Sequence, residues 1–201
     1  MDGTLFLGDS VLYLNEKLHL SPKLDEYHGA YYRGEITEVE MNVLQTPILQ
    51  KLEIDRAFQT LVTGPMLKQI REGVRLLKEK GRLEVSMLTF NPFQGLYTRF
   101  FGIGSEVSPS VEILDNRIAR IKTLPQNKIF FLRKYCEVKG ISLNQCIHVG
   151  EGKNDVPTFK EVGFSVALNA KEESVKREAS VALETDDFYV VARTILERIA
   201  Q

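Results

Sequence analysis

Apolar residues recur at helical spacing through the first third of the chain. Between residues 10 and 64, short amphipathic stretches repeat, as Val11, Leu14 and Leu18 illustrate. We therefore expect a small helical subdomain over 10–64. Apolar residues at three- and four-residue steps then predict a longer helix over 67–77, with Gly81 as its stop.

Beyond residue 82, short apolar runs alternate with amphipathic stretches. Strands are expected over 83–89, 146–149, 164–168 and 181–183, and helices over 92–101, 128–139, 156–162, 172–179 and 188–199. A strand pair around the turn Asp115-Asn116-Arg117 is expected over 107–123. Strands that alternate with helices predict an α/β fold with a doubly wound, Rossmann-like parallel sheet. Ligands bind such a sheet beyond the carboxyl ends of its strands.

Composition and charge narrow the choice of partners. The chain has 201 residues, which suits one core domain with a smaller insert. Lys+Arg number 26 against 27 Asp+Glu, so no basic excess favours nucleic acid or an anionic membrane. The sequence has no run of 18 apolar residues and no secretory signal pattern, and its two cysteines fit reduced thiols. We expect a cytoplasmic protein, either a monomer or a homodimer.

A glycine-rich acidic turn is the most notable candidate for chemistry. Residues 150–155 read Gly-Glu-Gly-Lys-Asn-Asp and lie where an apolar strand ends and a helix begins. Glu151 and Asp155, four residues apart, can converge on a hard cation such as Mg²⁺. A solvated acidic loop in which Asp155 caps the next helix is an equally weighted alternative.

Two further residues suggest an anionic ligand. Thr89 ends another predicted strand, where its hydroxyl and nearby backbone N–H groups can hold a phosphate oxygen. Lys128 opens a helix, an unfavourable place for a cation unless it serves an anion. A helix cap at Thr89 and a solvent-exposed Lys128 are the structural alternatives.

Taken together, these residues resemble the haloacid dehalogenase-like phosphohydrolases, in their phosphoserine phosphatase-like branch. Residues 1–5, Met-Asp-Gly-Thr-Leu, look like the end of the family's first motif, Asp-x-Asp-Gly-Thr. Thr89 and Lys128 match the second and third motifs, and 150–155 resembles the fourth, Gly-Asp-x-x-Asn-Asp. Lys128 precedes Glu151 by 23 positions, a spacing typical of this branch.

The resemblance implies a core over 1–9 and 65–201, and a helical cap over 10–64 inserted after the first motif. It also implies a Mg²⁺-dependent phosphatase that acts on a small phosphorylated metabolite through an aspartyl-phosphate. Asp2, Thr89 and Lys128 would be catalytic, with Asp2 protonating the leaving alcohol and later activating water. Phosphate would be bound by Gly3, Thr4, Thr89, Phe90, Asn91, Lys128 and Asn154, and metal by Asp2, Glu151 and Asp155.

The first motif departs from the family pattern. If Met1 is the middle residue of Asp-x-Asp, the nucleophilic aspartate and its strand would precede Met1, and a chain without them should be inactive. Asp2 as the nucleophile is the alternative. Loss of that central strand would leave the neighbouring strands with unpaired backbone groups. We expect that the sequence begins at an internal methionine.

Two other departures concern the metal and the substrate. Glu151 stands where the family has aspartate, which leaves the charge but adds a methylene. Residues 37–45 lack the arginine with which phosphoserine-specific relatives hold the substrate carboxylate, so phosphoserine is not the expected substrate. Two rivals stay open: a phosphate-binding protein without catalysis, and a phosphotransferase. His148 is expected to be a hydrogen-bonded core or crevice residue and His28 a residue of the cap surface.

Overall fold

The computed structural model describes residues 1–107, 111–121 and 127–200. Parallel β-strands lie at the centre of the protein. Three strands lie in the order β5 (Ile147–Gly150), β6 (Phe164–Leu168) and β7 (Val181–Leu183), with Val166 opposite both Val149 and Val181. A second parallel pair joins β1 (Ser86–Met87) to β2 (Ser105–Glu106). The predicted α/β fold with a parallel sheet is confirmed.

Strand β6 shows why helices cover both faces of the sheet. All five of its residues are buried. Val166 and Leu168 belong to the main apolar core together with α5 (Ile70–Glu79) and α10 (Phe188–Ile199). Ala167, which points to the opposite face, packs with residues of α8 (Val156–Phe159) and α9 (Glu173–Glu178). A parallel strand buried on both faces is continuously apolar for this reason.

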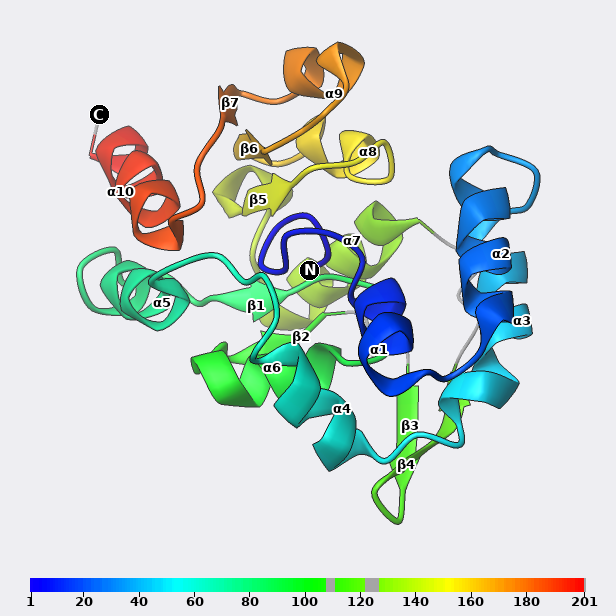
Figure 1. Ribbon diagram of the computed structural model, residues 1–201. Coiled ribbons are helices and arrows are strands. Elements are labelled where there is room, and N and C mark those ends of the chain that lie inside the picture. Colours follow the sequence, from blue (N-terminus) through cyan, green and yellow to red (C-terminus); the bar gives the residue numbers. More distant parts are fainter. Residues whose placement is uncertain (108–110, 122–126, 201) are drawn as a thin grey trace.

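The strands β1 and β5 face each other across a gap. Among the described residues, β1 is paired with β2 alone and β5 with β6 alone. A cavity of about 170 Å³ lies between them, lined by apolar residues of both, such as Met87 and Val149, and by Met1. Figure 1 shows the N-terminal loop beside this gap, between the labels of β1 and β5. In the part of the chain that the structure describes, no backbone hydrogen bond joins β1 to β5.

Four helices occupy residues 10–64: α1 (Ser10–Leu18), α2 (Pro22–Tyr32), α3 (Glu38–Leu49) and α4 (Ile54–Leu61). The first three begin at side chains that accept backbone N–H groups, namely Asp9, Ser21 and Thr37. Figure 1 shows α2 and α3 at the right of the molecule, away from the sheet. The helices are as predicted, and the division into a cap over 10–64 and a core over 1–9 and 65–201 stays a prediction.

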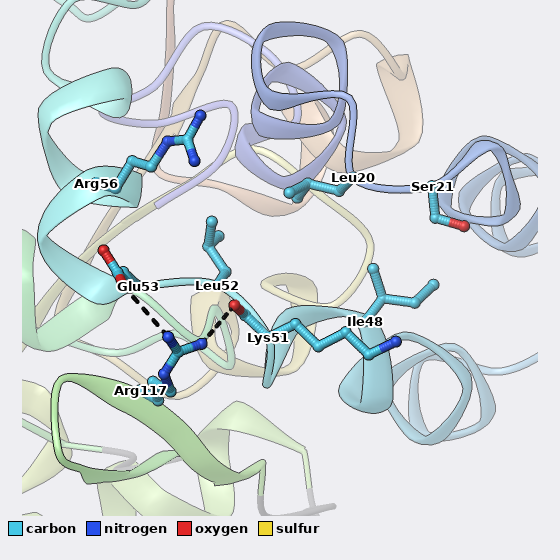
Figure 2. Close-up of a pocket in the computed structure, with 8 residues that line it drawn as sticks. All are labelled: Leu20, Ser21, Ile48, Lys51, Leu52, Glu53, Arg56 and Arg117. Atoms are coloured by element: carbon cyan, nitrogen blue, oxygen red, sulfur yellow. Dashed lines mark hydrogen bonds and ion pairs between the residues drawn. The ribbon is translucent and has the colours of Figure 1, made fainter.

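A β-hairpin extends from the core toward these helices. Strands β3 (Val111–Leu114) and β4 (Arg117–Ile121) are antiparallel, and both turn residues, Asp115 and Asn116, have positive φ. Ile54 N donates to the carbonyl of Asn116, and the Arg117 guanidinium donates to the carbonyl of Lys51 at 2.8 Å. Figure 2 shows Lys51 and Arg117 among the residues that line a cavity of about 310 Å³. The predicted hairpin is present where the structure describes it, while 108–110, 122 and 123 lie outside the described residues.

The remaining helices are α6 (Gln94–Phe101), α7 (Lys128–Lys139) and the 3₁₀ turn η1 (Leu143–Gln145). Several sequence boundaries need correction, and the helix predicted over 156–162, for example, ends at Phe159. The helix predicted from residue 67 begins at Ile70, after Gln69 in a left-handed conformation. The strand predicted over 83–89 is reduced to Ser86–Met87, because β2 offers it two partners. Among the described helices, none is long and apolar enough to span a membrane.

Candidate active site

A cavity of about 600 Å³ lies between the helical segment and the loops that follow β1 and β5. Segments distant in sequence supply its wall. Of the residues predicted for the site, it is lined by Asp2, Thr89, Phe90, Asn91, Lys128, Glu151 and Asn154. Gly3, Thr4 and Asp155 are absent from that lining and contact residues that belong to it.

Strand direction explains why these side chains meet. Thr89 follows β1 and Glu151 follows β5, and the carboxyl ends of parallel strands meet at one edge of a sheet. Lys128 is the first residue of α7, whose N-cap Asn127 accepts the amide of Phe130. The chain therefore places a lysine ammonium at a helix N-terminus, next to the acidic loop after β5.

Lys128 and Asp155 form a buried ion pair at the cavity wall. Lys128 Nζ donates to Asp155 Oδ1 at 2.7 Å, and His148 Nε2 lies 2.8 Å from the same oxygen. The amides of Glu151 and Gly152 donate to Asp155 Oδ2, each at 3.1 Å. Burial raises the pKa of Asp155, but Lys128 and His148 outweigh it and the pKa is lowered. Burial likewise opposes the charge of Lys128, while Asp155 and Glu151 raise its pKa. Both groups are charged at neutral pH.

Asp2 lies beside the turn that follows β1. Its Oδ2 accepts a hydrogen bond from Asn91 Nδ2 at 2.8 Å, and its Oδ1 accepts the Ser10 amide at 3.4 Å. Burial raises the pKa of Asp2 to about 6, although the Met1 ammonium and both hydrogen bonds lower it. A carboxyl group with this pKa exchanges its proton near neutral pH, as a general acid or base must.

Glu151 rests on the N-terminal turn. Its Oε2 accepts the Thr4 hydroxyl at 2.8 Å. Gly3 has φ +68°, and a Cβ at that position would lie 2.5 Å from Glu151 Cγ. The glycine therefore allows both the turn and the approach of the glutamate.

The second predicted motif is a compact turn after β1. Thr89 is buried, and its Oγ1 accepts the Asn91 amide at 3.2 Å. Asn91 Oδ1 accepts the amide of Phe93, while its Nδ2 donates to Asp2 and to Ser10 Oγ. This turn thus fixes the orientation of the Asp2 carboxylate.

Sequence reasoning missed a polar network on the helical side of the cavity. Asp9 Oδ2 lies 2.6 Å from His28 Nδ1 and accepts the Tyr32 hydroxyl at 2.7 Å. His28 Nε2 contacts Gln45 Oε1 at 2.9 Å, and Gln45 Nε2 donates to Asn42. The prediction of a surface position for His28 is wrong, because it is 3% exposed. The sequence signal that could have indicated this network was Asp9, which stands as an N-cap residue before an amphipathic stretch.

The carboxylates predicted to bind metal offer the all-oxygen chemistry that Mg²⁺ prefers. Asp155 is committed to Lys128, His148 and two amides, however. Within residues 1–107, 111–121 and 127–200, no three acidic, histidine or cysteine side chains form a group that could hold a metal. Asp2 and Glu151 fit in donor chemistry and line the cavity itself, so a cation held there would need further oxygens from its ligand.

Known proteins share this sequence pattern and this fold. The family model for haloacid dehalogenase-like hydrolases matches residues 105–195. A phosphoglycolate phosphatase from Methanopyrus kandleri is 32% identical over 135 residues, which cover 64% of this chain and 57% of that protein. A phosphoserine phosphatase from Streptomyces coelicolor is 23% identical over 186 residues, 90% of this chain and 45% of that one. The chain therefore spans about half the length of these two curated relatives.

Solved structures show the same fold. A HAD-family hydrolase from Salmonella enterica serovar Typhi superposes with a TM-score of 0.81 at 18% identity, covering 95% of this chain and 68% of that one. A substrate-bound phosphoserine phosphatase superposes with a TM-score of 0.76 at 19% identity, covering 98% and 94%. At these identities the likeness concerns the fold alone.

Proposed function

Because the chain belongs to the haloacid dehalogenase-like hydrolases and is phosphoserine phosphatase-like within them, we propose that it hydrolyses a small phosphomonoester of the cytoplasm. One observation carries this proposal. Asp2, Thr89, Lys128 and Glu151 come from four separate segments and line a single cavity of about 600 Å³. That volume suits a small metabolite.

The protein's own side chains would have separate roles in this hydrolysis. The Lys128 ammonium, held by Asp155 and His148, would bind phosphoryl oxygens and neutralise the charge that develops on them. Thr89 and the turn over 89–91 would hold another oxygen. Asp2, with a pKa of about 6, would donate its proton to the leaving alcohol and then accept one from water. A divalent cation such as Mg²⁺, when held by Glu151 and by oxygens of the ligand, would supply further charge neutralisation and leave the Asp2 carboxyl available for proton transfer.

The attack on phosphorus needs a carboxylate nucleophile besides the general acid. We propose that an aspartate two positions before Asp2 would serve as nucleophile and form an aspartyl-phosphate. Among the described residues, β1 pairs with β2 alone and β5 with β6 alone, and the cavity between them is lined mainly by apolar residues, which supports an added strand at this place.

The test compares two proteins in hydrolysis of an aryl phosphate with Mg²⁺. One is the 201-residue chain, and the other carries an engineered apolar strand that ends in aspartate immediately before Met1. Hydrolysis by the extended protein alone supports the proposed assignment. Hydrolysis by the unextended chain would instead make Asp2 the nucleophile, and an Asp2→Asn variant would then be silent.

The two rival functions are outcomes of the same experiment. If both proteins are folded and inactive but bind phosphate, the chain is a phosphate-binding protein. If labelled phosphate passes to an added alcohol instead of water, it is a phosphotransferase. Either result would contradict the proposed hydrolysis.

A further inference from the structure

The cations around the candidate site already have carboxylate partners. Lys128 is paired with Asp155 at 2.7 Å and His28 with Asp9 at 2.6 Å, both pairs being largely buried. At the rim, Arg33 binds Glu35 through two nitrogen atoms, and Lys153 lies 2.9 Å from Glu172. A ligand carboxylate would therefore compete with a protein carboxylate for each of these cations.

Acidic groups outnumber basic ones on this wall. The described lining residues include five carboxylates, Asp2, Asp9, Glu38, Glu151 and Glu172, against three Lys or Arg side chains, Arg33, Lys128 and Lys153. The amide of Gln45 is also committed, because it contacts His28 and donates to Asn42. The cavity wall as a whole therefore carries an excess of carboxylates, two of which, Asp9 and Glu38, lie on its helical side.

Glu38 differs from the other four carboxylates. It is the first residue of α3, and it lines the cavity from the helical side. Its side chain has no hydrogen bond or ion pair among the described residues, since the capping box at this helix end uses Thr37 and Glu40. Burial raises the pKa of Glu38, although the nearby Lys128 lowers it. A carboxylate that lines the cavity and has no protein donor can accept hydrogen bonds from a cationic group of the ligand.

We infer that the substrate is the phosphate ester of an amino alcohol without a carboxylate, with the ammonium bound by Glu38. This inference rests on the proposed phosphatase function and names its substrate class. A carboxylate on the same leaving group would meet Glu38 and Asp9 and lose affinity. Glu38 is thus a specificity-determining residue on the helical side of the cavity.

Three phosphate esters separate the contribution of the ligand ammonium to affinity from that of a ligand carboxylate. Phosphoethanolamine carries the ammonium alone, phosphoserine adds a carboxylate to it, and ethyl phosphate lacks both. Affinities are measured by calorimetry at pH 7.5 and low salt, for the unmodified chain, for Glu38→Gln and for Glu26→Gln. Glu26 is a matched control, since it is an exposed carboxylate on α2 that does not line the cavity.

We expect phosphoethanolamine to bind about tenfold more tightly than phosphoserine and about tenfold more tightly than ethyl phosphate, since unit charges a few ångströms apart change affinity by this order. Glu38→Gln should reduce both of these affinity ratios to about threefold or less, and Glu26→Gln should leave both unchanged. Should Glu38→Gln fail to fold, raising the salt concentration on the unmodified chain should shrink both ratios.

Equal affinity for phosphoserine or ethyl phosphate would overturn the inference, as would ratios that Glu38→Gln and salt leave unchanged. Binding is measured separately from hydrolysis, so the two proposals can fail independently. The expected selectivity, with no hydrolysis of any ester by the protein that carries the added strand and aspartate, would overturn the function alone. Hydrolysis of aryl phosphate with equal binding of phosphoserine would overturn the substrate class alone, and no binding of any ester would overturn both.

Discussion

Lys128 Nζ lies 2.7 Å from Asp155 Oδ1, in a buried pair that ties the start of α7 to the loop after β5. Gly150 permits this arrangement, because a Cβ there would lie 2.3 Å from Asp155 Cγ. The carboxylate thus orients the ammonium toward the cavity while its own oxygens are fully engaged.

Removing Lys128 should destabilise the fold strongly. Lys128→Met leaves the Asp155 carboxylate buried without its cation, and such a loss costs about 3–5 kcal/mol. Lys153→Met breaks the exposed pair with Glu172 and should cost less than about 1 kcal/mol. Urea unfolding at pH 7 measures both, and equal losses in the two variants would refute the structural role of the buried pair.

The pair of His28 and Asp9 should make stability depend on pH. Burial lowers the pKa of His28, but its hydrogen bond and charge interaction with Asp9 outweigh this and raise it above 6.5. Asp9→Asn keeps a side chain able to cap α1 and removes the charge. A group with a raised folded pKa contributes stability that is complete below its unfolded pKa, near 6.5, and is lost as pH rises through the folded pKa.

The unmodified chain should therefore exceed Asp9→Asn in stability most at pH 6, and the difference should shrink at higher pH. Proton NMR titration should show the His28 pKa falling in Asp9→Asn, whereas replacing the exposed His19 should leave it unchanged. A His28 pKa that is the same with and without the Asp9 charge would contradict this.

Gly3 and Gly102 offer a matched comparison, since both have φ +68°. A Cβ at Gly3 would collide with Glu151, while one at Gly102 would meet no described heavy atom within 4 Å. Gly102→Ala should cost roughly 1 kcal/mol from backbone strain, and Gly3→Ala should cost about 1–3 kcal/mol more. Thermal and urea unfolding measure the difference, and similar losses would show that Glu151 moves aside freely.

Metal binding can be measured without activity. With inorganic phosphate present, Mg²⁺ at ten times its dissociation constant should raise the unfolding midpoint by about 3–5 °C, and chelation should reverse the gain. Glu151→Ala should abolish the shift. Glu172→Ala, which removes another carboxylate of the same cavity, should retain it. A full shift in Glu151→Ala would remove Glu151 from the metal site.

Local sequence signals predicted the elements whose ends are set by residues of the same segment. Helix α7 spans Lys128–Lys139 as expected, because Asn127 caps its start and Gly140 adopts the left-handed conformation at its end. Strands β6 and β7 and helix α10 also match their predicted ranges. Their apolar periodicity is a property of the segment itself. Strand β1 is shorter than its apolar run because a strand extends as far as its partners do.

The sequence by itself determined the order of elements, the parallel α/β class and the motif residues that gather at one cavity, since parallel strands share one edge for their carboxyl ends. Only the tertiary structure decided which partners these residues take. It committed Asp155 to Lys128, buried His28 between Asp9 and Gln45, and left Glu38 without a partner among the described residues. Such pairings join side chains far apart in sequence, and their burial and charge exist only once the segments pack together.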